Sequence, residues 1–130
     1  QEQAEAVATA VHATDPGLAV LGLAGSAFLG CAQRLGLRTF SEAFADRAYR
    51  PDGRLVSRRE PGAVLTDAEQ ISHRVASMVR DGTVTAIDGS TIDIHVESVC
   101  VHGDSPGAVR IAEAVRRRLI HDGVVVAPFG

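Results

Sequence analysis

The chain has 130 residues, 45% of them hydrophobic, which suffices for one domain with a real core. A net charge of −3 and a pI near 5.9 give no electrostatic basis for binding nucleic acid or an anionic membrane surface. All 13 basic residues are arginine, so these residues contain neither a Schiff-base lysine nor a lysine phosphate clamp.

The spacing of apolar residues predicts alternating helices and strands. In chain order we expect a helix over residues 1–12, a strand over 18–23, a helix from Ser26 to Leu35, a strand over 37–44, an irregular loop over 50–63, a helix from 66 to Gly82, a hairpin of strands 83–87 and 91–95, a strand over 98–102, and a helix from Pro106 that ends before Gly123. This order indicates an α/β protein with parallel strands and a hairpin before the last strand. Three core strands cannot close a barrel, so the chain looks like part of a larger domain.

Capping residues support the helix boundaries. Ser26 is placed to cap the second helix, and residues 66–69 read Thr-Asp-Ala-Glu, a capping box for the third. Before the last helix, Asp104 or Ser105 can accept from free helix N–H groups, and Pro106 suits the first helical position.

Residues 98–108 carry the clearest sign of a site. Val99 and Val101 belong to a buried strand that ends at His102, and Asp104 follows directly. An imidazole and a carboxylate therefore stand at the carboxyl end of a strand beside a helix N-terminus, where α/β proteins build their sites. The alternative is purely structural, because a helix cap and a strand-ending histidine need no chemistry.

The two cysteines, Cys31 and Cys100, lie inside apolar helix and strand runs. The sequence has no C-x-x-C motif and no secretory or transmembrane segment. We therefore expect reduced, buried thiols in a cytoplasmic protein rather than a disulfide or a metal site.

Four segments resemble, in the same order, the motifs of a known family. They are VLGLAGS at 20–26, EAFADRAY at 42–49, DGRLVSR at 52–58 followed by PGA at 61–63, and VCVHGDSPGA at 99–108. These segments are similar to those of the LamB/YcsF lactam-utilisation family, whose members are the A subunits of 5-oxoprolinase. The resemblance spans nearly all 130 residues and corresponds to roughly the C-terminal half of a family member.

The resemblance implies that residues 1–130 are a single domain, the C-terminal half of a β/α barrel of the glycoside hydrolase/deacetylase type. It implies a cytoplasmic, ATP-dependent 5-oxoprolinase that opens the lactam of 5-oxo-L-proline to L-glutamate. The implied partners are the B and C subunits of 5-oxoprolinase and the N-terminal half of its own barrel, and the cofactor is ATP, with Mg²⁺ as a candidate. Two motifs of the family's N-terminal half are absent from this sequence, so we expect activity to need that half.

An unactivated lactam is a poor electrophile, and coupling to ATP can convert its amide oxygen to a phosphorylated leaving group before water attacks. Such a site needs anionic clamps and a group that handles protons. The catalytic candidates are the acid or base groups His102, Asp104 and Glu42, and the substrate-binding candidates are Arg47, Asp46 and Arg58. An alternative role of carrying Mg²⁺ stays open for Glu42, Asp46, His102 and Asp104. We assign no metal ligand, and the remaining histidines lack metal-ligand spacing. Asp46 and Arg47 have an alternative as a structural ion pair.

Two other functions stay open from the residues alone. One is a non-catalytic half-barrel remnant or interaction module, and the other is a metal-dependent amidohydrolase or deacetylase, which rests on fold analogy alone. A degenerate module is expected to lose polar residues at buried strand ends, because they cost stability without function. The presence of Glu42, Arg47, His102 and Asp104 therefore favours the enzyme.

Overall fold

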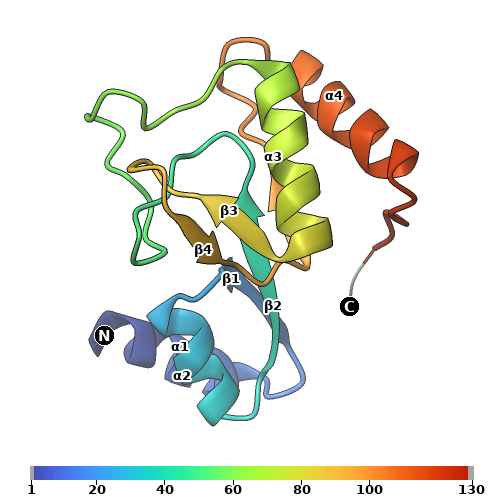
Figure 1. Ribbon diagram of the computed structural model, residues 1–130. Helices are drawn as coiled ribbons and strands as arrows, with labels where there is room; N and C mark the ends of the chain where they lie inside the picture. The colour runs from blue at the N-terminus through green and yellow to red at the C-terminus, as the bar shows by residue number, and fades with distance from the viewer. Residues whose placement is uncertain (1, 129–130) are drawn as a thin grey trace.

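The computed structural model describes residues 2–128 and has the predicted alternation of helices and strands (Figure 1). Its elements are α1 (Glu2–Thr14), β1 (Ala19–Leu23), α2 (Ala27–Arg34), β2 (Arg38–Phe44), α3 (Ala68–Asp81), β3 (Thr83–Thr85), β4 (Thr91–Asp93), β5 (Ser98–Cys100) and α4 (Ala108–His121). The strands that the sequence predicted are present with bounds shifted by up to two residues.

The three core strands form one parallel sheet in the order β1-β2-β5. Glu42 of β2 lies at the register position between Leu23 of β1 and Ser98 of β5. The strands β3 and β4 form a separate antiparallel hairpin. These findings confirm the α/β class, the parallel strands and the hairpin inserted before the last core strand.

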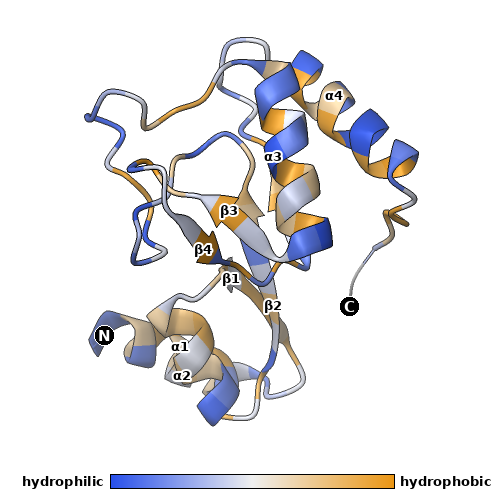
Figure 2. Ribbon diagram, viewed as in Figure 1, coloured by the Kyte–Doolittle hydropathy of each residue, from blue (hydrophilic) through white to orange (hydrophobic). Residues whose placement is uncertain are grey.

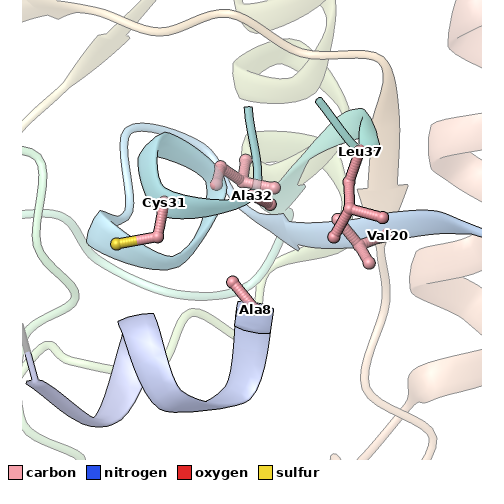
Figure 3. Packing of buried hydrophobic residues seen from close by; sticks show 6 residues of the cluster. Ala8, Val20, Cys31, Ala32 and Leu37 are labelled. Carbon is pink, nitrogen blue, oxygen red and sulfur yellow. The ribbon is translucent and has the colours of Figure 1, made fainter. Parts of the chain in front are cut away.

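The helices and the hairpin pack on one face of this sheet. Val20 of β1 contacts a cluster of small and apolar side chains from α1 and α2, which Figure 3 shows around Ala8 and Cys31. Val99 of β5 packs instead against a cluster that includes Ile71 of α3 and Ile111 of α4. Burying each aliphatic side chain of this size stabilises the fold by roughly 1.5–3 kcal/mol.

The opposite face of the sheet lacks such a cover in the described part of the chain. Because side chains alternate along a strand, Leu21, Phe40 and Glu42 point away from the face that carries Val20. Leu21 is 41% exposed although it lies in a central position of β1. The strands β1 and β5 are also the two edges of the sheet, each paired on one side only.

The two long C-terminal helices pack on each other through their apolar faces. Figure 2 shows hydrophilic residues on the outward surface of α3 and α4 and hydrophobic residues toward the core. Buried residues from both helices meet in one cluster, which comprises Ile71, Val75, Ile111, Val115 and Leu119 together with Ala45. No helix within residues 2–128 is long and apolar enough to cross a membrane.

The helix starts confirm one cap and correct two. Ser26 caps α2, where its Oγ accepts from the Leu29 N–H at 3.4 Å. The capping box prediction for α3 is off by one residue, because Asp67 rather than Thr66 is the N-cap and accepts from the Gln70 N–H at 2.7 Å. The Asp67 carboxylate, one position later, reaches the same free N–H groups.

The predicted start of α4 is wrong. The helix begins at Ala108, and its N-cap is Gly107, which has a φ of 77° and no side chain to accept a hydrogen bond. Neither Asp104 nor Ser105 caps the helix, and Pro106 precedes it rather than occupying its first position. The loop over 103–107 makes an additional turn, and glycine is the residue that adopts this left-handed conformation without strain.

Both cysteines are free, and the predicted burial is confirmed for Cys31 and wrong for Cys100. Cys31 is buried between α1 and α2, whereas Cys100 is only half-buried at the end of β5.

Candidate functional site

Polar side chains gather just beyond the carboxyl ends of β2 and β5. Asp46 lies two residues after β2 and His102 two residues after β5, and these strands are neighbours in the sheet. His102 Nδ1 lies 2.6 Å from Asp46 Oδ1, although the residues are 56 positions apart in sequence. Asp46 is 1% exposed, so a carboxyl group is held inside the protein against an imidazole.

The Asp46 contact fixes which nitrogen of His102 can act on a ligand. A carboxylate only accepts hydrogen bonds, so the Nδ1–H of His102 donates to it. This leaves Nε2 as the free nitrogen of a side chain that is 19% exposed. The ring of Phe44 meets the imidazole edge to face, with centroids 4.9 Å apart and planes at 80°. The imidazole is therefore oriented by two neighbours and keeps one nitrogen for chemistry.

Ser105 is a site residue that sequence reasoning missed. Its Oγ donates to the second carboxylate oxygen, Asp46 Oδ2, at 3.1 Å. Serine before a helix most often caps that helix, and for this reason the sequence predicts a cap at Asp104 or Ser105. The sequence signal for its contact with Asp46 is its position three residues after His102, on the loop that follows β5.

Main-chain bonds hold the segment that carries Asp46. The Ala45 N–H donates to the Cys100 carbonyl at 2.9 Å, which extends the β2–β5 pairing past the strand ends. The Phe44 N–H donates to the Tyr49 hydroxyl oxygen at 2.9 Å, and the Leu65 N–H donates to the Asp46 carbonyl at 2.8 Å. These bonds tie both sides of Asp46 to fixed parts of the fold.

Arg74 of α3 supports the same segment. Its Nη1 donates to the carbonyls of Arg47 at 2.7 Å and Ala45 at 3.3 Å, and its guanidinium carbon lies 5.3 Å from the centroid of the Tyr49 ring. Burial lowers the pKa of Arg74 and raises the pKa of Tyr49. The sequence signal for this role is a charged residue directly before Val75, inside the apolar periodicity of the helix.

Arg47 is placed differently from Asp46, its neighbour in sequence. It is 7% exposed, and its Nη2 donates to the Val56 carbonyl at 2.6 Å, so it fastens the long loop that follows β2. Its Nε is buried without a partner. Asp46 bonds to His102 and Ser105, and Arg47 bonds to the Val56 carbonyl. The two residues therefore do not form the structural ion pair that the sequence left open.

Arg58 and Asp104 face each other across two loops. Arg58 Nη1 lies 4.0 Å from Asp104 Oδ2, and the side chains are 55% and 77% exposed. The contact links the loop over 50–63 to the turn that follows His102. Arg50 and Glu60 form a second ion pair within the long loop at 2.5 Å. Both predicted site residues thus lie near the His102 loop, but in solvent.

Glu42 lies on the uncovered face of the sheet, one strand position away from Ala43, which packs in the core. The pKa of the Cys100 thiol is raised, first by burial and then by the negative charges of Glu42 and Asp46. Glu42 therefore lies near Cys100, on the same face of the sheet. His102 follows Cys100 by two residues. Asp46 and His102 are in direct contact, whereas the contacts described for these two residues do not include Glu42.

A hollow of about 1110 Å³ opens beside the end of β1. It is lined by residues 23–27, by the loop over 51–55 and by residues 91–95 of the hairpin. His102, Asp46 and Glu42 do not line it. Within residues 2–128, no three His, Cys, Asp or Glu side chains gather as a metal site.

Parallel strands, with acid and base side chains beyond their carboxyl ends, give this chain the layout in which α/β proteins build their sites. The sequence profile of the LamB/YcsF family matches residues 1–130. The chain belongs to the LamB/YcsF family.

Relatives and a solved structure agree with this assignment. The chain is 69% identical over 127 residues to the 5-oxoprolinase A subunit of Mycolicibacterium gilvum and 52% identical over 128 residues to the 5-oxoprolinase A subunit 1 of Agrobacterium fabrum. Each match covers 98% of this chain and 50% of the relative. A crystal structure of the lactam utilization protein from Thermus thermophilus matches with a TM-score of 0.89 and 41% identity, over 98% of this chain and 51% of that one. The chain spans about half the length of the proteins it matches.

Proposed function

We propose that this chain is the C-terminal half of the A subunit of a cytoplasmic, ATP-dependent 5-oxoprolinase, which opens 5-oxo-L-proline to L-glutamate. The observation that carries the proposal is the His102 imidazole, held by the buried carboxylate of Asp46 at the carboxyl edge of the sheet. The names of the relatives supply the substrate class, a small lactam.

In this proposal His102 is the group that moves protons. Lactam opening forms a bond between a water oxygen and the carbonyl carbon and breaks the ring C–N bond, and the departing nitrogen must gain a proton. ATP would supply the activation of the lactam oxygen that lets water attack this poorly reactive carbonyl carbon. His102 Nε2 takes the proton from the attacking water and returns it to that nitrogen, while Asp46 stabilises the imidazolium in between. A positioned acid or base of this kind contributes roughly 10²–10⁴-fold to the rate.

The other candidate residues take different roles in the proposal. Asp46 orients His102 and does not bind substrate directly, because it is buried and already bonded to two side chains. Arg58 is half-exposed beside the His102 loop and is the candidate to bind the substrate carboxylate, which replaces Asp104 as its partner. Glu42 is the second acid or base group, and Arg47 serves the loop.

The described residues do not make a complete site for ATP or Mg²⁺. Of the two arginines considered for an anionic ligand, Arg47 is buried against a carbonyl and Arg58 is already assigned to the substrate carboxylate. Three metal-ligating side chains do not come together anywhere in residues 2–128. We therefore assign ATP to the whole enzyme and to no residue of this half.

The other half of the barrel and the B and C subunits are the proposed partners. The uncovered sheet face around Leu21 and the two unpaired edges at β1 and β5 support a partner polypeptide that adds parallel strands. The twofold greater length of the relatives supports a second half of equal size. Size-exclusion chromatography with light scattering tests this, because a monomer of the isolated chain that exposes no apolar surface contradicts a half-barrel.

The activity test reassembles the enzyme. The chain is mixed with the N-terminal half of a relative and with the B and C subunits, and ATP-dependent formation of glutamate is measured. We expect His102→Ala to lower kcat by about 100-fold or more, since it removes the proton-handling group. His95→Ala is the control, because His95 is an exposed histidine on the hairpin side of the molecule. Unchanged turnover in His102→Ala contradicts the proposal.

A further inference from the structure

The second oxygen of the buried Asp46 carboxylate is held by a serine hydroxyl. Oδ1 receives the His102 Nδ1–H at 2.6 Å, and Oδ2 receives the Ser105 hydroxyl at 3.1 Å. We propose that Ser105 is a positioning residue for the reaction, which fixes the Asp46 carboxylate and through it the His102 imidazole. The inference rests on the proton-transfer role proposed above for His102.

The physical reason is the freedom of a carboxylate about its last torsion. This torsion is broad and roughly two-fold, so one hydrogen bond leaves the plane of the group poorly defined. A second donor on the other oxygen fixes that plane and aims Oδ1 at Nδ1. The side chain of Asp46 is fully buried, so water does not replace a missing donor easily.

The local backbone directs Ser105 to Asp46, so Ser105 does not cap α4. The loop over 103–107 closes with the Ala108 N–H donating to the Ser105 carbonyl at 3.1 Å, and Gly107 adopts a φ of 77°. As a result α4 starts without a side-chain cap, although Asp104 and Ser105 both precede it. The Ser105 hydroxyl is directed to Asp46 and not to the helix N-terminus.

The same contact also ties three separate segments together. Asp46 follows β2, His102 follows β5, and Ser105 lies in the turn before α4. The Ser105 hydroxyl sets the distance between this turn and the loop that holds Asp46. A shift of the turn therefore changes the direction of His102 Nε2, the nitrogen that is free to act on a ligand.

The test compares Ser105→Ala with Ser105→Thr, which keeps a hydroxyl. The matched control is Ser90→Ala, because Ser90 Oγ also donates to an aspartate, Asp88 Oδ1 at 2.6 Å, but on the exposed hairpin turn. The first readout is the Nδ1–H proton resonance of His102 in the chain assembled with the N-terminal half of a relative, assigned by its loss in His102→Gln. The second is kcat and KM for ATP-dependent glutamate formation in the reassembled enzyme.

We expect Ser105→Ala to broaden the Nδ1–H resonance and to speed the exchange of this proton with water. The same variant lowers kcat about tenfold with little change in KM, because it removes a part of the rate contribution of a positioned acid or base. Ser105→Thr restores both, and Ser90→Ala changes neither. An unchanged resonance in Ser105→Ala, or equal losses in the alanine and threonine variants, overturns the inference. The resonance is measured without substrate, so it decides the role of Ser105 even where the proposed 5-oxoprolinase activity fails.

Discussion

Two side-chain pairs, Asp46–His102 and Arg58–Asp104, lie at the His102 loop, and their surroundings differ completely. Asp46 and His102 meet at 2.6 Å inside the protein, whereas Arg58 and Asp104 stand 4.0 Å apart with both side chains more than half exposed. A buried pair that is fully hydrogen-bonded has one geometry, and an exposed pair exchanges freely with water and salt. The difference teaches that the buried pair sets the direction of a reactive group, while the exposed pair is free to release its arginine to a ligand.

The largest expected effect comes from removing the carboxylate of each pair in turn. Asp46→Ala leaves the His102 and Ser105 donors without their buried acceptor, so we expect the free energy of unfolding to fall by about 3 kcal/mol. Asp104→Ala is the exposed counterpart, and we expect a change below about 0.5 kcal/mol. Urea unfolding followed by circular dichroism measures both. Similar losses in the two variants would show that burial does not separate the pairs.

The exposure of Glu42 lies between that of the buried Asp46 and that of the exposed Asp104. Its negative charge is detectable through its effect on the Cys100 thiol. Burial, Glu42 and Asp46 raise the pKa of the Cys100 thiol, so it stays protonated to a higher pH than a free cysteine and reacts slowly at about pH 8. Glu42→Gln removes a negative charge and lowers that pKa. We expect the rate of alkylation by iodoacetamide at about pH 8 to rise about threefold.

The alkylation is measured in a Cys31→Ala background, which leaves a single thiol. Glu113→Gln serves as the control, because Glu113 is an exposed carboxylate on α4. An equal rate in Glu42→Gln and in the parent chain would place the Glu42 carboxylate away from Cys100 and from the candidate site.

The smallest expected effect belongs to the Arg58–Asp104 pair. A double-mutant cycle with Arg58→Ala and Asp104→Ala is expected to give a coupling energy of about 0.3 kcal/mol, and this coupling disappears in about 0.5 M salt. A coupling above about 1 kcal/mol that resists salt would mean that the two loops are fixed to each other, and Arg58 would then be unable to bind a substrate carboxylate.

Strand positions and parallel order were predictable because their signals are local. The buried apolar runs at β1, β2 and β5 and the turn residues between them indicate a parallel α/β sheet with an inserted hairpin. The strand end at His102 and the family motif that contains Asp46 also put both among the candidates. What the residues alone could not establish was their contact, since no local pattern joins positions 56 residues apart.

The errors came from side chains with two possible partners. Ser105 before a helix satisfies a capping pattern, and only the three-dimensional course of the 103–107 loop sends its hydroxyl to Asp46. Arg47 follows Asp46 directly, so the sequence left a structural ion pair between them open, but the backbone turns the Arg47 guanidinium toward the Val56 carbonyl. Tertiary structure decides between such partners, and sequence spacing does not.

The free edge of β1 has a consequence for handling the isolated chain. Its five residues, Ala19–Leu23, contain no charge and no proline, the features that keep edge strands from pairing with other molecules. A row of unpaired N–H and C=O groups beside the exposed Leu21 forms a surface on which another copy can add by strand pairing. The chain should therefore aggregate as its concentration rises and stay in solution when a second half covers this strand.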